Sequence, residues 1–193
     1  MTDPTNAPTV RWATALAFLA GLAAAGIATA LAVSRDRSLV ADASQMTLDG
    51  IEKSIRVRFG DFPQISSSDL AAWLADESRA RPQLLDVRES DEYAVSHLPG
   101  AIQIDPDAPA DDVLARIDPS RPVVAYCSVG YRSSLLVERL RAVGFTQAVN
   151  LEGSIFAWAN AGHPLESDGR RVTVVHPYDS RFRLLLKAEH RAW

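Results

Sequence analysis

The chain has a single cysteine, Cys127, among its 193 residues. One cysteine cannot form an internal disulfide, and no group of cysteine and histidine residues has the spacing of a zinc site. Positive charge is not in excess either, because 20 lysines and arginines face 24 aspartates and glutamates and the formal net charge is -4. A mildly acidic chain without a basic cluster is not typical of nucleic-acid-binding proteins. We therefore expect no metal, no cofactor and no nucleic-acid partner.

A long uncharged run occurs near the N-terminus, over residues 12–33, and alanine dominates it. At ~1.5 Å per helical residue, this run is long enough to cross the ~30 Å hydrocarbon layer of a membrane. It predicts a single-pass transmembrane anchor. A cleaved signal peptide is the alternative, because Ala28-Thr29-Ala30 fits a small-residue cleavage site.

The charges around this run bear on which side of the membrane holds the rest of the chain. Arg35 and Arg37 follow the run, whereas Arg11 alone supplies basic charge before it. Because cytoplasmic flanks carry the excess of basic residues, we expect a cytoplasmic catalytic domain. A free thiol also fits a reducing compartment. Cleavage of a signal peptide would instead give an exported, periplasmic domain.

The chain beyond the run is long enough for one domain with a hydrophobic core. Ahead of that domain, Leu48, Ile51 and Ile55 recur at helical spacing and predict a short amphipathic helix. The sequence divides into a polar tail (1–11), the anchor (12–33), a linker with this helix (34–60), the domain (61–165) and a strand–helix extension (166–193).

Short apolar runs alternate with helical patterns along the domain. Ser66 with Asp69 forms a capping-box pattern at a helix start, and Asp111 is a candidate cap for another helix. Strands and helices that alternate at this spacing indicate an α/β fold, with a central parallel sheet and helices on both faces. The predicted strands are 84–87, 101–104, 123–126 and 148–151, followed by a tail strand (172–175) and a basic helix (181–191).

Cys127 comes directly after the predicted strand 123–126, and ligands of parallel α/β sheets bind beyond the carboxyl ends of the strands. A six-residue loop from Cys127 to Arg132 then leads to a helix that we expect to open at Ser133. Loop amides and the positive end of a helix favour negative charge, so they lower the pKa of a thiol there. The pattern predicts a nucleophilic cysteine. The alternative is a small buried hydrophobic side chain that ends a core strand.

The rest of the loop supplies the surroundings of the sulfur. Gly130 allows a turn that a Cβ would obstruct. The planar guanidinium of Arg132 suits an oxyanion such as thiosulfate or a sulfonate. Ser133 is expected to cap the helix or to donate a hydrogen bond toward the sulfur. The predicted substrate-binding residues are Ser128, Val129, Gly130, Tyr131, Arg132 and Ser133.

Four segments of the domain occur in the order of a known family. They are Leu84-Leu85-Asp86-Val87-Arg88; Glu92-Tyr93 with His97-Leu98-Pro99-Gly100-Ala101; Cys127-Ser128-Val129-Gly130-Tyr131-Arg132-Ser133; and Asn150-Leu151-Glu152-Gly153-Ser154 to Trp158 with Gly162-His163-Pro164-Leu165. Together they resemble the rhodanese (sulfurtransferase) family over roughly residues 61–165. The family commonly has glycine where Ser96 stands, in a turn with little bearing on the chemistry.

The resemblance implies a mechanism of covalent catalysis. The thiolate of Cys127 attacks the outer sulfur of a small donor, thiosulfate or a persulfide, and becomes a persulfide itself. The loop amides then hold the terminal sulfur until cyanide, a thiol or a sulfur-carrier protein removes it. Asp86 and Arg88 match the family's motif, and we expect them to organise the strand end and the loop by hydrogen bonding.

Two other functions remain open for the same cysteine loop. Cysteine phosphatases and arsenate reductases also combine a cysteine with an arginine at a helix start, but generally with five residues between the two. Four residues separate Cys127 from Arg132, and this smaller ring suits one sulfur atom better than a phosphate. The second alternative is a membrane-tethered module that carries a persulfide to a partner, or only docks a partner, without turnover.

Overall fold

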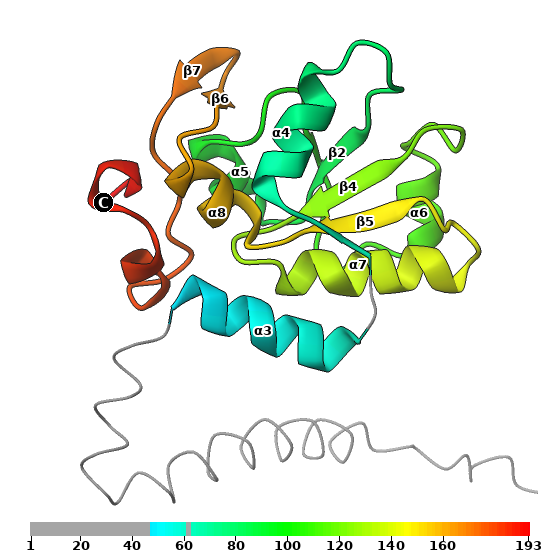
Figure 1. Cartoon of the computed structure of the whole chain (residues 1–193), viewed down its shortest axis with the longest axis horizontal. Helices are drawn as coiled ribbons and strands as arrows, with labels where there is room; N and C mark the ends of the chain where they lie inside the picture. The colour runs from blue at the N-terminus through cyan, green and yellow to red at the C-terminus, as the bar shows by residue number, and fades with distance from the viewer. Residues whose placement is uncertain (1–46, 61–62) are drawn as a thin grey trace, which may run out of the picture. The chain divides into compact units, whose positions relative to one another are not determined.

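The computed structural model describes residues 47–60 and 63–193 (Figure 1). Within these ranges no helix is both long enough and apolar enough to cross a membrane. The predicted anchor over residues 12–33 lies outside the described residues, as does the signal-peptide alternative. Both therefore stay predictions, and so does the side of the membrane that holds the domain.

The described part of the chain is built on a five-stranded parallel sheet in the order β1-β5-β4-β2-β3. All four strands predicted within the domain are present, and the two predicted over 123–126 and 148–151 have the expected bounds. The strands are β1 (Gln64–Ile65), β2 (Gln83–Asp86), β3 (Ile102–Gln103), β4 (Val123–Tyr126) and β5 (Ala148–Leu151).

Helices cover both faces of this sheet, which confirms the predicted α/β architecture (Figure 1). Helices α4, α5 and α8 lie on one face, whereas α6 and α7 lie on the other. The helices are α3 (Leu48–Phe59), α4 (Ser67–Ala75), α5 (Ser90–Val95), α6 (Ala110–Leu114), α7 (Tyr131–Ala142) and α8 (Ser154–Asn160).

Side chains on the two faces of the central strand β4 pack into two separate hydrophobic clusters. Val124 and Tyr126 pack into the cluster beneath α4 and α8. Val123 and Ala125 pack into the cluster beneath α6 and α7. Side chains alternate between the faces of a strand, so Cys127, the next residue in the second series, also joins the α7 cluster. The period of the strand thus directs the thiol toward α7.

The two predicted helix caps have different outcomes. Ser66 is the N-cap of α4, and its hydroxyl oxygen accepts a hydrogen bond from the backbone N–H of Asp69 at 3.1 Å. The cap predicted at Asp111 is wrong, because Pro109 is the N-cap of α6. Asp111 lies within the first helical turn, where its negative charge interacts favourably with the positive end of the helix dipole.

Helix α3 occupies the residues where a short amphipathic helix was predicted. It lies beside α7 and buries Ile55, whereas Val57 is 86% exposed. Arg56 also pairs with Glu152, the residue after β5, with 2.5 Å between Nε and Oε1. The helix is therefore docked against the domain by Ile55, by the partly buried Leu48 and Ile51, by an edge-to-face contact of Phe59 with Tyr131 and by this ion pair.

The C-terminal extension begins with an antiparallel hairpin of β6 (Leu165–Ser167) and β7 (Arg170–Val172). The strand predicted over 172–175 is therefore displaced, and only Val175 forms a further bridge, with Arg191. The helix predicted over 181–191 is wrong, because two 3₁₀ helices, η2 (Phe182–Leu185) and η3 (Ala188–His190), take its place.

The side chain of Asn160 explains why no continuous helix forms in the extension. Its amide donates to the carbonyl of Leu185 at 2.8 Å and accepts from the N–H of Lys187 at 2.8 Å. These backbone groups are the ones that a helix would use internally. Leu185 and Leu186 are both buried, and Leu186 takes an extended conformation between the two short helices.

We predict that Ile55→Ala lowers the free energy of unfolding by about 2–3 kcal/mol, because it removes a buried side chain between α3 and the domain. Val57→Ala on the same helix is the matched control and should change stability by less than about 0.5 kcal/mol. Urea denaturation of both variants measures the difference. Equal, small effects would show that the contact of Ile55 with the domain does not stabilise the fold.

Candidate functional site

The cysteine loop lies at the carboxyl end of β4, as predicted, but the following helix begins earlier than expected. Gly130 is the N-cap of α7 and has a φ of 110°, so Tyr131 is the first helical residue. A Cβ at Gly130 would lie 3.3 Å from Nδ2 of Asn150, in a backbone conformation that other residues rarely adopt. Ser133 is consequently inside the first helical turn, and its predicted role as helix cap is wrong.

Cys127 is buried, with 1% of its surface exposed, and its sulfur faces hydrogen-bond donors. The N–H of Gly130 donates to Sγ at 3.1 Å. Burial alone raises the pKa of the Cys127 thiol, but the charge of Arg132 and the backbone amides of Ser133 and Gly130 outweigh burial and lower it. The site therefore favours a thiolate.

The hydroxyl of Ser133 has a competing partner. It donates to Oδ1 of Asn150 at 2.6 Å, while the amide group of Asn150 donates to Gln64. A hydroxyl has one hydrogen, so this bond leaves none for the sulfur. The backbone N–H of Ser133, rather than its hydroxyl, is then the donor that stabilises the thiolate.

Arg132 is not the free cation that the sequence suggested. Its guanidinium forms two hydrogen bonds with the carboxylate of Glu92 in α5, Nη1 to Oε2 at 2.7 Å and Nη2 to Oε1 at 2.9 Å. Ser128 joins them, because its hydroxyl donates to Oε1 of Glu92 at 2.8 Å and accepts from Nη2 of Arg132 at 2.9 Å. The guanidinium group that was expected to bind a substrate oxyanion is therefore already bonded to a carboxylate.

Glu92 is only 2% exposed, and its ionisation depends on this contact. Burial raises the pKa of its carboxyl, but the hydrogen bonds and charge of Arg132, with the bond from Ser128, lower it overall. Glu92 lies in a segment that resembles the family, but it was not among the predicted site residues. The motif contains a carboxylate and the loop contains one arginine, and this pairing of charges could have indicated the contact.

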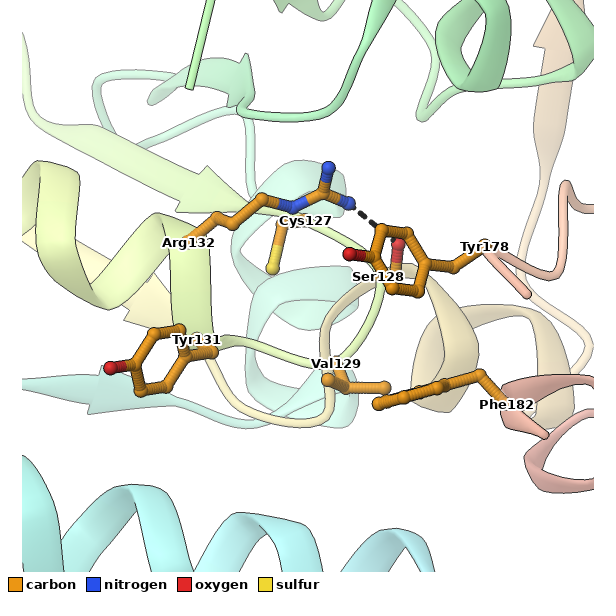
Figure 2. A pocket seen from close by; sticks show the side chains of 7 residues that line it. All are labelled: Cys127, Ser128, Val129, Tyr131, Arg132, Tyr178 and Phe182. Atoms are coloured by element: carbon orange, nitrogen blue, oxygen red, sulfur yellow. Dashed lines mark hydrogen bonds between the residues drawn. The ribbon is translucent and has the colours of Figure 1, made fainter. Parts of the chain in front are cut away.

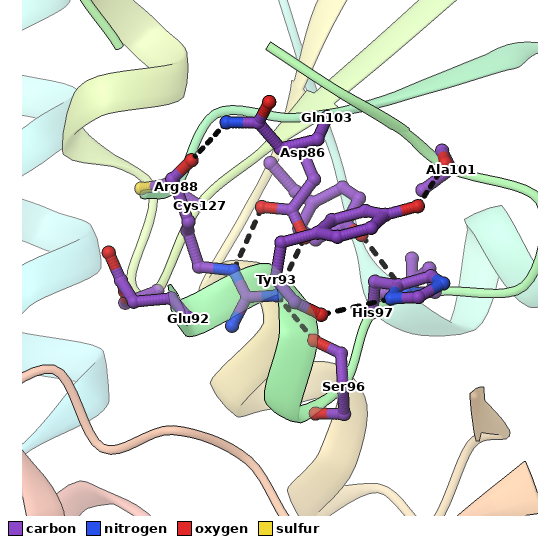
Figure 3. Close-up of polar contacts among 12 residues, drawn as sticks. Asp86, Arg88, Glu92, Tyr93, Ser96, His97, Ala101, Gln103 and Cys127 are labelled. Atoms are coloured by element: carbon purple, nitrogen blue, oxygen red, sulfur yellow. Dashed lines mark hydrogen bonds and ion pairs between the residues drawn. The ribbon is translucent and has the colours of Figure 1, made fainter. Parts of the chain in front are cut away.

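Asp86 and Arg88 form a second ion pair next to the cysteine loop (Figure 3). Both side chains are fully buried, with Nε to Oδ1 at 2.8 Å and Nη2 to Oδ2 at 2.6 Å. Nη2 of Arg88 also donates to the carbonyl of Ser96 at 2.6 Å, beyond the end of α5. Burial opposes the charge of Arg88, yet the carboxylate of Asp86 raises its pKa overall. The pair ties the end of β2 to α5, the helix that carries Glu92.

Cys127 adjoins a pocket of about 200 Å³ (Figure 2). Two of its lining residues, Tyr178 and Phe182, come from the C-terminal extension, in which no site residue was predicted. No motif in the extension signals this position, because only the fold brings it back to the loop. The pocket is lined by Cys127, Ser128, Val129, Tyr131, Arg132, Tyr178 and Phe182.

Six loop residues were predicted to bind substrate, and they divide into two groups in the structure. Ser128, Val129, Tyr131 and Arg132 line the pocket. Gly130 and Ser133 instead face the sulfur through their backbone amides. Over residues 47–60 and 63–193, no group of three or more histidine, cysteine or acidic side chains is placed to hold a metal ion.

We predict that Arg132→Gln raises the pKa of the Cys127 thiol, because it removes a positive charge that stabilises the thiolate. The pH midpoint for alkylation of Cys127 by iodoacetamide should therefore move to higher pH. Arg141→Gln, near the other end of α7, is the control and should leave the midpoint unchanged. An unchanged midpoint in Arg132→Gln would contradict the assigned cause.

Comparisons with known proteins agree with the fold. The family model of the rhodanese-like domain matches residues 68–161. The chain is 34% identical over 102 residues to a sulfurtransferase of Allochromatium vinosum, which covers 53% of this chain and 92% of that protein. It is also 34% identical over 102 residues to the probable adenylyltransferase/sulfurtransferase MoeZ of Mycobacterium tuberculosis, over 52% of this chain. The chain spans only 25% of the length of MoeZ.

Solved structures show the same architecture. The rhodanese-like domain of the Alr3790 protein from Anabaena sp. has a TM-score of 0.50 and 28% identity, over 54% of this chain and 79% of that one. A thiosulfate sulfurtransferase from Pseudomonas aeruginosa has a TM-score of 0.54 at 24% identity, over 63% of this chain and 23% of that one, and shows the fold alone. The chain therefore belongs to the family of rhodanese-like domains, and its relatives support the sulfurtransferase class.

Proposed function

We propose that the protein transfers a sulfane sulfur from a donor such as thiosulfate or a persulfide to a thiophilic acceptor, through a persulfide on Cys127. The observation that carries the proposal is a buried thiol whose pKa is lowered and which borders a pocket. A thiolate is the reactive form of cysteine, so a lowered pKa raises the fraction that can attack at neutral pH.

The first step needs no oxidant, reductant or proton. The Cys127 thiolate attacks the outer sulfur of thiosulfate, a sulfur–sulfur bond forms, and the bond to the sulfite sulfur breaks with its electron pair. Sulfite leaves, and the negative charge moves to the terminal sulfur of the new persulfide. The amides of Gly130 and Ser133, which face the sulfur, support that charge.

The second step returns the enzyme to its starting form. Cyanide, a thiolate or the thiolate of a carrier protein attacks the terminal sulfur, and the Cys127 thiolate is the leaving group. The same low pKa that favours attack makes Cys127 a good leaving group. The sequence of two half-reactions is a ping-pong mechanism.

Glu92 argues against phosphatase or arsenate reductase activity. Its carboxylate takes both guanidinium donors of Arg132 that a phosphate would need. A phosphate dianion in the loop would also lie near that carboxylate and be repelled by it. If the protein hydrolyses an aryl phosphate and Cys127→Ser abolishes that activity, phosphatase activity would be favoured over sulfur transfer.

We predict that Cys127→Ser abolishes the formation of thiocyanate from thiosulfate and cyanide. Serine is nearly isosteric with cysteine, and its hydroxyl oxygen can accept the N–H of Gly130 as the sulfur does, so the fold should persist. Circular dichroism checks the fold, and the colour of the iron–thiocyanate complex measures the product. Turnover that survives the substitution would overturn the mechanism.

The carrier alternative makes a different kinetic prediction from the enzyme. A carrier loads one sulfur per chain from thiosulfate and releases it to cyanide slowly or not at all. The proposed enzyme instead shows product that grows linearly with time past one equivalent. A burst that stops at one equivalent would favour the carrier.

We also propose that residues 12–33 anchor the chain in a membrane with the domain in the cytoplasm, on the strength of the uncharged run and its flanking arginines. The full-length chain should then stay in the membrane fraction after alkaline carbonate extraction. A soluble mature protein that begins near Ser34 would contradict the anchor and favour a cleaved signal peptide.

A further inference from the structure

Aromatic side chains from the C-terminal extension form part of the pocket at Cys127. Tyr178 and Phe182 line it together with Val129 and Tyr131, and Figure 2 shows these side chains around the cysteine loop. The rings of Tyr178 and Phe182 meet edge to face, with 5.5 Å between centroids. Both residues lie beyond residues 68–161, so they are not part of the family match.

Arg132 and Ser128, two of the polar side chains in the same pocket, already have partners. Arg132 is bound through two hydrogen bonds to Glu92, and its guanidinium carbon lies 5.1 Å from the ring centroid of Tyr178. The hydroxyl of Ser128 donates to the same carboxylate. A doubly charged donor would therefore find no unengaged cation among the lining side chains, and it would meet the field of Glu92.

The segment that carries Tyr178 and Phe182 is held in place by hydrogen bonds and by packing on the domain. Asp179 accepts the N–H groups of Arg181 and Phe182 at 2.8 and 2.9 Å. Leu185, at the end of the same short helix, is buried, and its carbonyl is bonded to Asn160 of α8. Phe182 therefore belongs to a fixed surface rather than to a free tail.

We propose that Tyr178 and Phe182 determine donor specificity, so that Cys127 accepts sulfur fastest from donors whose leaving group is apolar or aromatic. This inference rests on the sulfur transfer proposed above. An aromatic leaving group would lie against Tyr178 and Phe182, where burial of apolar surface and ring contacts stabilise it. Thiosulfate, whose leaving group is the sulfite dianion, gains none of this.

Thiosulfonates test the inference, because they deliver the same sulfane sulfur from leaving groups of different size. The Cys127 thiolate attacks the terminal sulfur of the thiosulfonate anion, the sulfur–sulfur bond to the sulfonyl group breaks, and a sulfinate anion leaves with the electron pair. Two negative charges enter the step and two leave it, so no proton or redox partner is needed.

The experiment compares benzenethiosulfonate with methanethiosulfonate. The second-order rate constant for loading of Cys127 is measured by acid quench and intact mass, and each rate is divided by the rate with free cysteine to remove intrinsic reactivity. We expect the corrected rate to be about tenfold or more higher for the benzene compound, as one apolar group in a fitted pocket provides. Corrected thiosulfate loading should be slower than both.

Two variants locate the source of this preference. Tyr178→Ala truncates a half-exposed side chain, so the fold is not at risk, and Phe182→Ala removes the second ring. Each should lower the corrected benzene-to-methane ratio severalfold. Tyr178→Phe should keep the ratio. Leu184→Ala, on the same short helix but 67% exposed and outside the pocket lining, is the matched control and should also keep it.

The outcomes separate this inference from the proposed function. A corrected ratio near one in the unchanged protein, or a ratio that both alanine variants retain, overturns the aromatic selection while sulfur transfer stands. Faster corrected loading from thiosulfate than from benzenethiosulfonate overturns it as well. If Cys127 takes up sulfur from none of these donors, the proposed sulfur transfer itself fails.

Discussion

The ion pair between Glu92 and Arg132 is the contact on which the cysteine site depends. It joins α5, which follows β2, to α7, which follows β4. Ser128, in the loop between β4 and α7, is bonded to the same pair. Glu92 is almost fully buried, so removal of Arg132 would leave a buried carboxylate without its partner, which is strongly unfavourable. The pair also sets the electrostatics of the site. Arg132 keeps enough positive charge near the sulfur to lower the pKa of Cys127, while Glu92 occupies the guanidinium donors that an oxyanion substrate would use.

The second buried pair gives this arrangement its support. Arg88 binds Asp86 at the end of β2 and the carbonyl of Ser96 after α5, so both ends of the helix segment that carries Glu92 are tied to the sheet. The amides of Gly130 and Ser133 then complete the surroundings of the sulfur from the other side. A thiolate at the edge of a parallel sheet is thus stabilised by fixed backbone dipoles and by a cation whose own charge is balanced.

Local patterns in the sequence predicted the elements that local forces decide. The strand 123–126 is apolar and contains two β-branched residues, and Ser66 accepts the N–H of Asp69 within the first turn of α4, so both elements were found. The helix start at Ser133 was wrong because Gly130 reaches a left-handed conformation that begins the helix at Tyr131. The tail helix was wrong because a side chain distant in sequence, Asn160, takes the backbone bonds that the helix would need. Glu92 and Tyr178 reach the site only through tertiary packing, which no spacing rule encodes.

Intact-mass analysis of the purified protein after exposure to thiosulfate shows whether Cys127 receives and holds a sulfane sulfur. We expect a gain equal to one sulfur atom per chain, located on Cys127 by peptide mapping and removed by cyanide. An unchanged mass, or an added sulfur that persists in Cys127→Ala, would contradict it.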